Sequence, residues 1–204
     1  MNLQPALIVV ISTPPSDVSD GFDSHTALTR VTGMVEQASV AGLMTVCVVP
    51  SRLAAGVQGL PAACRIFSTN ATATHHGIAH AVQATPHHPG WLVLPASAPV
   101  PKAATFRAVA HQIAESPVVV PAHDGRPGYP AGFASEFYSE LARVRHEDEI
   151  SRMLSRYPVT HIAVDEPEWV GQWPWTSRPD QRPQRLEVYG SPVRTALPRR
   201  SRTG

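Results

Sequence analysis

Residues 118–133 have the clearest chemical potential in this sequence. They read Val-Val-Val-Pro-Ala-His-Asp-Gly-Arg-Pro-Gly-Tyr-Pro-Ala-Gly-Phe, an apolar run that leads into a glycine-rich segment. Gly125, Gly128 and Gly132 let the backbone turn tightly and approach a ligand closely. Arg126 presents a planar fork of donors that suits a carboxylate or a phosphate. The pattern predicts a strand followed by an anion-binding loop, and the alternative is a rigid turn with a solvated arginine.

The rest of the chain alternates apolar runs with helix-like patterns. The runs are short, rich in Val, Ile and Leu, and mostly continuous, as expected of strands covered on both faces. Helical spacing appears at Leu28, Val31 and Val35, again just after Pro101, and after Ser135, which we expect to be an N-cap. This alternation predicts an α/β fold with a mostly parallel sheet and helices on both faces. The predicted strands are residues 6–12, 44–50, 91–95, 117–121 and 159–164.

Ligands of such sheets bind beyond the carboxyl ends of the strands. This rule indicates the loops after residues 11, 94 and 120. Ser12 and Thr13 lie at the end of the first predicted strand, where hydroxyls and backbone amides could hold an anion.

Composition narrows the class of protein. The chain has 204 residues, 43% of them hydrophobic, and a formal charge of +1, which gives no general attraction to nucleic acid or membrane. No apolar run approaches the roughly 20 residues of a membrane helix, and the start lacks a basic signal-peptide region. We therefore expect a cytoplasmic protein. Cys47 and Cys64 lie in or beside apolar stretches and are expected to be reduced core cysteines.

The C-terminal segment differs from the rest. We predict a domain over residues 1–170 and a disordered tail over residues 171–204, because the tail is rich in Pro and Arg and poor in apolar residues. Its positive charge could contact an acidic partner, but a solubilising end is the favoured interpretation.

A family resemblance rests on these motifs together. Residues 121–133, followed by a helix and then by His146-Glu-Asp-Glu-Ile, resemble the MobA-like nucleotidyltransferases, in particular the molybdenum-cofactor cytidylyltransferase branch. Residues 92–106 resemble the central strand and next helix of that family, and the resemblance covers about residues 5–165. It implies a Rossmann-like three-layer α/β/α fold of the nucleotide-diphospho-sugar transferase kind. It also implies transfer of a nucleotide from an NTP to a molybdopterin-like or other phosphorylated acceptor, with Mg²⁺.

The resemblance also implies the site residues. Ser12, Thr13 and Asn70 would contact the nucleotide, and Arg126 the acceptor. The whole predicted substrate-binding set is Ser12, Thr13, Asn70, Ser97, Asp124, Gly125, Arg126, Gly128 and Tyr129, and Tyr129 takes the usual place of a histidine.

The sequence departs from the family at the charged positions. No Lys or Arg precedes Arg30, and the first loop contains aspartates instead. Their negative charge would repel a triphosphate unless bound Mg²⁺ made the loop attractive to it. Ser97 stands where the family keeps a metal-binding Asp. Asp17, Asp20 or Asp165 could hold the metal, but we assign no catalytic residue and no metal ligand.

Two functions of different class therefore stay open. The first is a nucleotidyltransferase with an eroded site, and the second is a non-catalytic binding or scaffold protein associated with cofactor maturation. A hydrolase is disfavoured because no Gly-x-Ser-x-Gly elbow occurs. His76 and His80 have the i,i+4 spacing of zinc ligands, but surface or capping roles are favoured for them and for His75.

Overall fold

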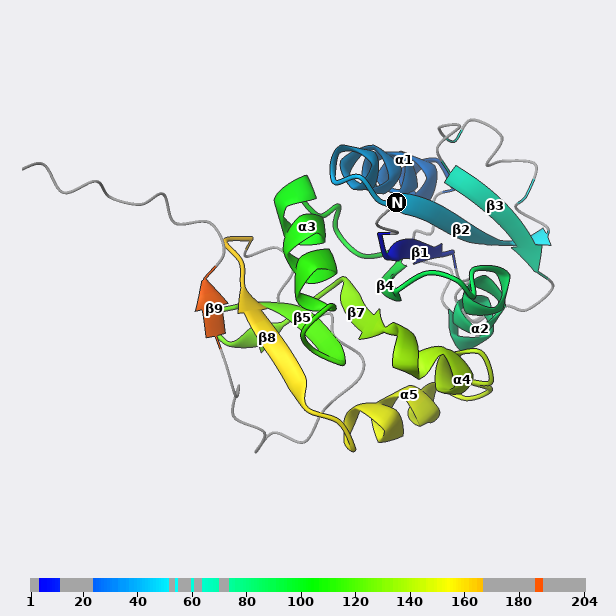
Figure 1. Cartoon of the computed structure of the whole chain (residues 1–204). Helices are drawn as coiled ribbons and strands as arrows, with labels where there is room; N and C mark the ends of the chain where they lie inside the picture. The colour runs from blue at the N-terminus through cyan, green and yellow to red at the C-terminus, as the bar shows by residue number, and fades with distance from the viewer. Residues whose placement is uncertain are drawn as a thin grey trace, which may run out of the picture.

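The computed structural model describes residues 4–11, 24–51, 54, 60, 64–69, 74–166 and 186–188. These residues form a nine-stranded sheet between layers of helices (Figure 1). The strands are β1 (Ala6–Val10), β2 (Met44–Pro50), β3 (Cys64–Thr69), β4 (Gly90–Pro95), β5 (Val118–His123), β6 (Arg126–Pro127), β7 (Ala131–Ala134), β8 (Val159–Ala163) and β9 (Leu186–Val188). The helices are α1 (Ser24–Val40), α2 (Thr74–Ala84), α3 (Ala103–Gln112), α4 (Tyr138–Leu141) and α5 (Glu147–Leu154), with a 3₁₀ turn at Ser135–Phe137.

The strand order is β3-β2-β1-β4-β7-β5-β8-β9, and β6 pairs with β5 beside this path. Strand β7 is antiparallel to both β4 and β5, and β6 is antiparallel to β5. The other neighbouring strands are parallel. The predicted α/β class with a mostly parallel sheet is thereby confirmed.

The helices cover the two faces of the sheet. Helices α1 and α3 lie on one face and contact each other, whereas α2 and α4 contact each other on the opposite face (Figure 1). All five residues of β1 are buried, since the strand is covered on both sides. In the described part of the chain, no helix has the length and apolar character needed to span a membrane.

The predicted strand bounds agree closely with the structure at β2 and differ elsewhere. Strand β1 ends at Val10, and β5 continues to His123 because it pairs with β6 there. The apolar runs of the sequence did not predict β3 or the four-residue β7. Strand β3 lies at an edge of the sheet, where polar residues can be exposed.

Of two predicted helix starts, one is confirmed and one is wrong. Helix α3 begins at Ala103, just after Pro101, with Lys102 as N-cap. Ser135 is not an N-cap, because Ala134 takes that position at the 3₁₀ turn. The backbone N–H of Ser135 instead donates to the carbonyl oxygen of Pro89 at 3.0 Å, which ties the turn to the start of β4.

The segment predicted as a disordered tail contains β9. This strand is parallel to β8, with His161 opposite Leu186. The remainder of residues 171–204 lies outside the described residues, so the predicted domain boundary stays a prediction.

Gly132 lies in strand β7 and not in a loop turn as its sequence context suggested. A Cβ atom at this position would lie 2.7 Å from Val109 Cγ1 and 2.9 Å from Ile113 Cδ1. The absence of a side chain therefore allows α3 to pack directly on β7.

The N-terminus of α3 is capped by side chains from distant elements. The carboxylate of Glu166, just after β8, accepts hydrogen bonds from the backbone N–H of Lys102 at 3.2 Å and from the hydroxyl of Thr105. Gln37 of α1 accepts from the N–H of Ala103 through Oε1 at 2.9 Å. Glu166 is 3% exposed. The first N–H groups of a helix have no acceptor within the helix. These contacts therefore give acceptors to donors that would otherwise have none.

Replacing Gly132 with Ala is expected to lower the free energy of unfolding by roughly 1–3 kcal/mol, because the new methyl overpacks the contact with α3. Urea unfolding provides the measurement. In the double variant Gly132→Ala/Val109→Ala, the total loss should be smaller than the sum of the single losses, since the second change makes room for the methyl. Additive losses would contradict the packing explanation.

Glu166→Ala is expected to lower the free energy of unfolding by about 2–4 kcal/mol, because it leaves two donors without an acceptor in a buried place. Glu166→Gln keeps a carbonyl acceptor and should cost less than Ala. The exposed neighbour Asp165 provides the control, and Asp165→Ala should change stability by less than about 0.5 kcal/mol. Equal effects at 165 and 166 would mean that the cap is unimportant.

Candidate functional site

The strand order makes the C-terminal ends of β1 and β4 a topological switch point, which we call the crevice. From β1 the chain passes to β2 and β3 on one side, and it then returns to β4 on the other side of β1. Such a reversal separates the connections that leave the two strands, and ligands of open α/β sheets bind there. The C-terminal ends of β5 and β8 lie at the same edge, because β7 is antiparallel to both β4 and β5 and β8 is parallel to β5.

The β4 side of this crevice is a tight turn that exposes Ser97. The N–H of Ala96 donates to the carbonyl oxygen of Val10 at 2.9 Å, and the N–H of Ala98 donates to that of Pro95 at 3.0 Å. Ser97 lies between these anchored residues with its side chain exposed. The other residues predicted beside the crevice, Ser12, Thr13 and Asn70, lie outside the described residues.

Arg30 also reaches this turn, although it was not among the predicted site residues. Its Nη1 donates to the carbonyl oxygen of Ser97 at 3.4 Å, and both residues are exposed. Helical spacing places Arg30 on α1, but its approach to a residue 67 positions away depends on the fold.

The predicted anion-binding loop is a β-hairpin with a two-residue tip. Asp124 and Gly125 have φ values of 48° and 75°, and His123 pairs with Arg126 across the hairpin. Two positive φ values at the tip are typical of the type I′ turn that Asp-Gly favours. Asp124, Gly125 and Arg126 are all exposed. In the described part of the chain the Arg126 side chain makes no hydrogen bond or ion pair, so its guanidinium can bind a ligand.

His123 is held beside this tip. Its Nδ1 lies 3.0 Å from the carbonyl oxygen of Val164, and its Nε2 lies 3.6 Å from Asp124 Oδ2. The first contact fixes the ring plane relative to the end of β8. The hairpin thereby carries an imidazole, a carboxylate and a guanidinium in adjacent positions.

Gly128 and Tyr129 lie behind the hairpin. The N–H of Gly128 donates to the carbonyl oxygen of Pro121 at 2.8 Å, and Tyr129 is 4% exposed and joins the hydrophobic core. The peptide bond between Tyr129 and Pro130 is cis. These positions support the shape of the hairpin, and their contact with a ligand stays a prediction.

The acids after β8 have different surroundings. Asp165 is exposed, whereas both oxygens of the buried Glu166 already accept hydrogen bonds at the N-terminus of α3. Within the described ranges, no group of three or more His, Cys, Asp or Glu could hold a metal ion. These residues alone therefore do not fit a divalent cation, and Asp17 and Asp20 lie outside them.

The histidines of α2 form a cluster of rings. The centroids of His75 and His76 are 4.3 Å apart, and those of His75 and His146 are 6.4 Å apart. His80 packs edge-on against Phe67 at 5.8 Å. His76 and His80 thus have different neighbours.

The two cysteines are free thiols on neighbouring strands. A hydrogen bond between them raises the pKa of Cys47, which burial raises further, and lowers the pKa of Cys64. Cys64 begins β3 and therefore lies away from the C-terminal edge.

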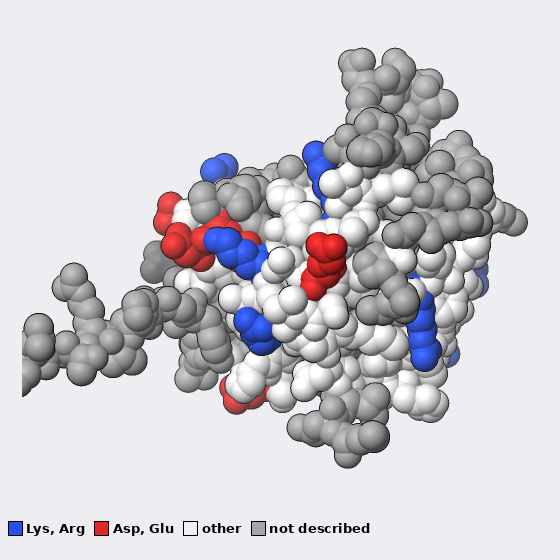
Figure 2. Space-filling view, turned by 90° about the horizontal axis from the view of Figure 1, so that it is seen from above, with Lys and Arg blue, Asp and Glu red and all other residues white. Residues whose placement is uncertain are grey.

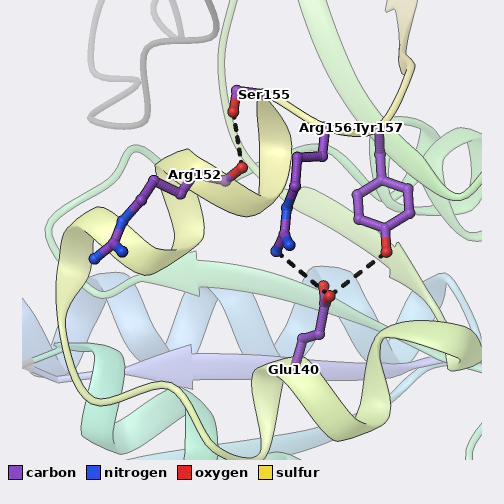
Figure 3. A network of polar contacts seen from close by, with 5 residues as sticks. All are labelled: Glu140, Arg152, Ser155, Arg156 and Tyr157. Carbon is purple, nitrogen blue, oxygen red and sulfur yellow. Dashed lines mark hydrogen bonds and ion pairs between the residues drawn. The ribbon is translucent and has the colours of Figure 1, made fainter.

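A hollow of about 630 Å³ lies between α4 and α5, near the edge where β8 begins. There Glu140 Oε1 lies 3.5 Å from both Arg156 Nη2 and the hydroxyl of Tyr157 (Figure 3). Arg152, on the next turn, directs its guanidinium away from Glu140 and pairs with Asp148 at 2.5 Å. This hollow is at the opposite edge from the crevice.

The face of the molecule seen from above Figure 1 carries charges of both signs. In its described part, acidic and basic side chains are interspersed among uncharged residues (Figure 2). Local placement of individual charges therefore determines how this face interacts with a ligand.

Several solved structures share this fold. The chain is 18% identical to Rv0371C of Mycobacterium tuberculosis, in a complex with manganese, with a TM-score of 0.64 over 80% of this chain and 89% of that one. It is 14% identical to a nucleotidyl transferase from Methanothermobacter, with a TM-score of 0.61 over 80% and 88%. It is 10% identical to the 4-diphosphocytidyl-2C-methyl-D-erythritol synthase of Anaerococcus prevotii, with a TM-score of 0.59 over 81% and 89%. At these identities the likeness concerns the fold.

No curated protein sequence matches the chain. The family described as the MobA-like NTP transferase domain matches residues 21–162, which include α1, the turn after β4 and the hairpin. With the sheet order and the crevice described above, this match shows that the chain belongs to the MobA-like NTP transferase family.

Proposed function

We propose that the protein binds a nucleoside triphosphate in the crevice between β1 and β4 and a phosphorylated acceptor at the β5–β6 hairpin. In the reaction, an acceptor phosphate oxygen would bond to the α-phosphorus of the NTP and pyrophosphate would leave. A molybdopterin-like compound is the proposed acceptor, and the cytoplasm is the proposed location. Family membership supports the reaction class.

The guanidinium of Arg126, which has no hydrogen bond or ion pair among the described residues, is the observation that carries the acceptor half of this proposal. It directly follows the two-residue tip of the hairpin, opposite the oriented His123, at the sheet edge that also holds the C-terminal ends of β1 and β4. An arginine fork binds phosphate with two parallel hydrogen bonds, and a rigid support reduces the entropy lost on binding. Asp124 and Gly125 would contribute mainly through the shape of the tip.

A non-catalytic binding or scaffold protein is the second candidate, and a specific observation favours it. Ser97 offers a hydroxyl where a metal-binding carboxylate would be needed, and Glu166 is occupied at the cap of α3. A neutral hydroxyl is a poor ligand for Mg²⁺. Metal-dependent transfer would then depend on Asp17, Asp20 or Asp165.

Nucleotide binding is expected to raise the melting temperature. Millimolar CTP or GTP with Mg²⁺ or Mn²⁺ should raise it by roughly 5 °C or more if the nucleotide is present at about 100 times its Kd. Differential scanning fluorimetry provides the measurement, and the unphosphorylated nucleoside is the control. An unchanged melting temperature would count against the nucleotide site. Binding without pyrophosphate release in the presence of a phosphorylated pterin would favour the scaffold candidate.

Arg126→Ala is expected to weaken binding of a phosphorylated pterin by about tenfold or more, because it removes a charge-assisted contact worth about 1.5–3 kcal/mol. Arg126→Lys should restore part of the affinity, since it keeps the charge and loses the fork. Isothermal titration calorimetry measures both. Arg145→Ala removes the same charge from an exposed position outside the hairpin and should leave the affinity unchanged. If Arg126→Ala has no effect, the hairpin is structural only.

A further inference from the structure

Arg30 is the cation that the fold brings to the crevice from α1. Three residues on one face of α1 contact, in succession, the segment between β4 and α3 and the first residue of α3. Arg30 donates to Ser97, a Cβ at Gly33 would lie 3.3 Å from Val100, and Gln37 accepts from the N–H of Ala103. Residues spaced by three or four positions share a helix face, so the segment runs along α1. Arg30 is at the end of this contact nearest to the C-terminus of β4.

The guanidinium of Arg30 has most of its donors available. An arginine carries five N–H donors, and the described contact uses one of them at the long distance of 3.4 Å. With the residues that the structure describes, Arg30 makes no other hydrogen bond or ion pair. The side chain is exposed, so a ligand in the crevice can reach it. The one hydrogen bond holds the guanidinium at the turn, and its acceptor is a neutral carbonyl that does not neutralise the positive charge.

The electrostatics of the crevice make this cation significant. The sequence contains no Lys or Arg before Arg30, so the connection that leaves β1 supplies no positive side chain. The described residues also lack a metal-binding group that could provide positive charge at this edge. A polyphosphate requires positive charge or many donors to leave water. Arg30 lies at the topological switch point where a ligand of this fold is expected.

We infer that Arg30 binds the phosphate chain of the nucleotide. The inference rests on the proposed function, which places a nucleoside triphosphate in the crevice between β1 and β4. Each of the two ligands is then bound by its own arginine: Arg30 binds the nucleotide, and Arg126 binds the acceptor. Ser97 is then a positioning residue, because its backbone carbonyl holds the Arg30 side chain at the crevice.

Arg107 provides a matched control within the same packing layer. Its Nη1 donates to the carbonyl oxygen of Val40 at 3.1 Å, and the residue is exposed. It thus makes the same kind of contact at the opposite end of α1. Arg107→Ala removes the same charge and a similar hydrogen bond to a backbone carbonyl, but it does not alter the crevice.

The test measures the Kd of CTP and GTP by isothermal titration calorimetry, in the presence of Mg²⁺, for the wild type, Arg30→Ala, Arg30→Lys and Arg107→Ala. Arg30→Ala is expected to weaken the tighter-binding nucleotide by roughly tenfold to a hundredfold, which corresponds to the loss of a charged hydrogen bond. Arg30→Lys should fall between Arg30→Ala and the wild type, and Arg107→Ala should change the affinity less than twofold. Binding of a phosphorylated pterin should be unchanged in Arg30→Ala and weakened in Arg126→Ala.

The possible failures are distinguishable. If the wild type binds the nucleotide and Arg30→Ala binds it equally well, the role of Arg30 is wrong and the nucleotide site stands. If the wild type binds neither nucleotide, both the nucleotide site and the role of Arg30 are wrong. Equal losses in Arg30→Ala and Arg107→Ala would assign the effect to support of α1 and would also overturn the inference. Arg30→Lys keeps the test valid if Arg30→Ala does not fold.

Discussion

Strand β7 is the connection on which the rest of the sheet depends. Gly132 pairs with Leu92 of β4 on one side and with Val119 of β5 on the other. Neighbouring strands are about 4.8 Å apart, so this insertion separates β4 and β5 by about 10 Å. The turn with Ser97 and the hairpin with Arg126 therefore occupy separate positions along one edge. That spacing keeps the two proposed phosphate sites apart.

The electrostatic character of this edge follows from which charges the fold uses internally. The Glu166 carboxylate is buried at the start of α3, where it satisfies helix donors. Arg30 and Arg126 are exposed, and among the described residues the Arg126 side chain has no hydrogen bond or ion pair and that of Arg30 has one. Asp124 and Asp165 are exposed at the same edge, so its described part carries charges of both signs. The proposed phosphate sites therefore depend on where each guanidinium lies and not on an excess of positive charge.

The sequence was sufficient to predict the elements that are buried and locally encoded. Strand β2 is apolar except for the buried Thr45, and its predicted and observed bounds agree. The Asp124-Gly125 turn has a local signal as well, because these residue types favour positive φ. Strand β3 was not predicted, because Arg65 and Ser68 interrupt its apolar residues. Both are exposed, as an edge strand allows.

The contacts that define the site required the fold. Arg30 and Ser97 are 67 positions apart, and Thr105 and Glu166 are 61 apart. No periodicity in the sequence encodes such pairings. The resemblance to a family indicated the acceptor loop but did not indicate Arg30. The sequence also gave no sign that Glu166 is used as a cap.

Helix α1 is attached to the β4–α3 unit along its length. Arg30 bonds to the segment between β4 and α3, Gln37 bonds to the first residue of α3, and Arg107 of α3 bonds to Val40 at the end of the helix. A force applied at the Ser97 turn is therefore shared among contacts spaced from Arg30 to Val40. The helix, the turn and α3 should move as one rigid body, so that a ligand bound at the Ser97 turn would slow amide exchange as far away as Val40.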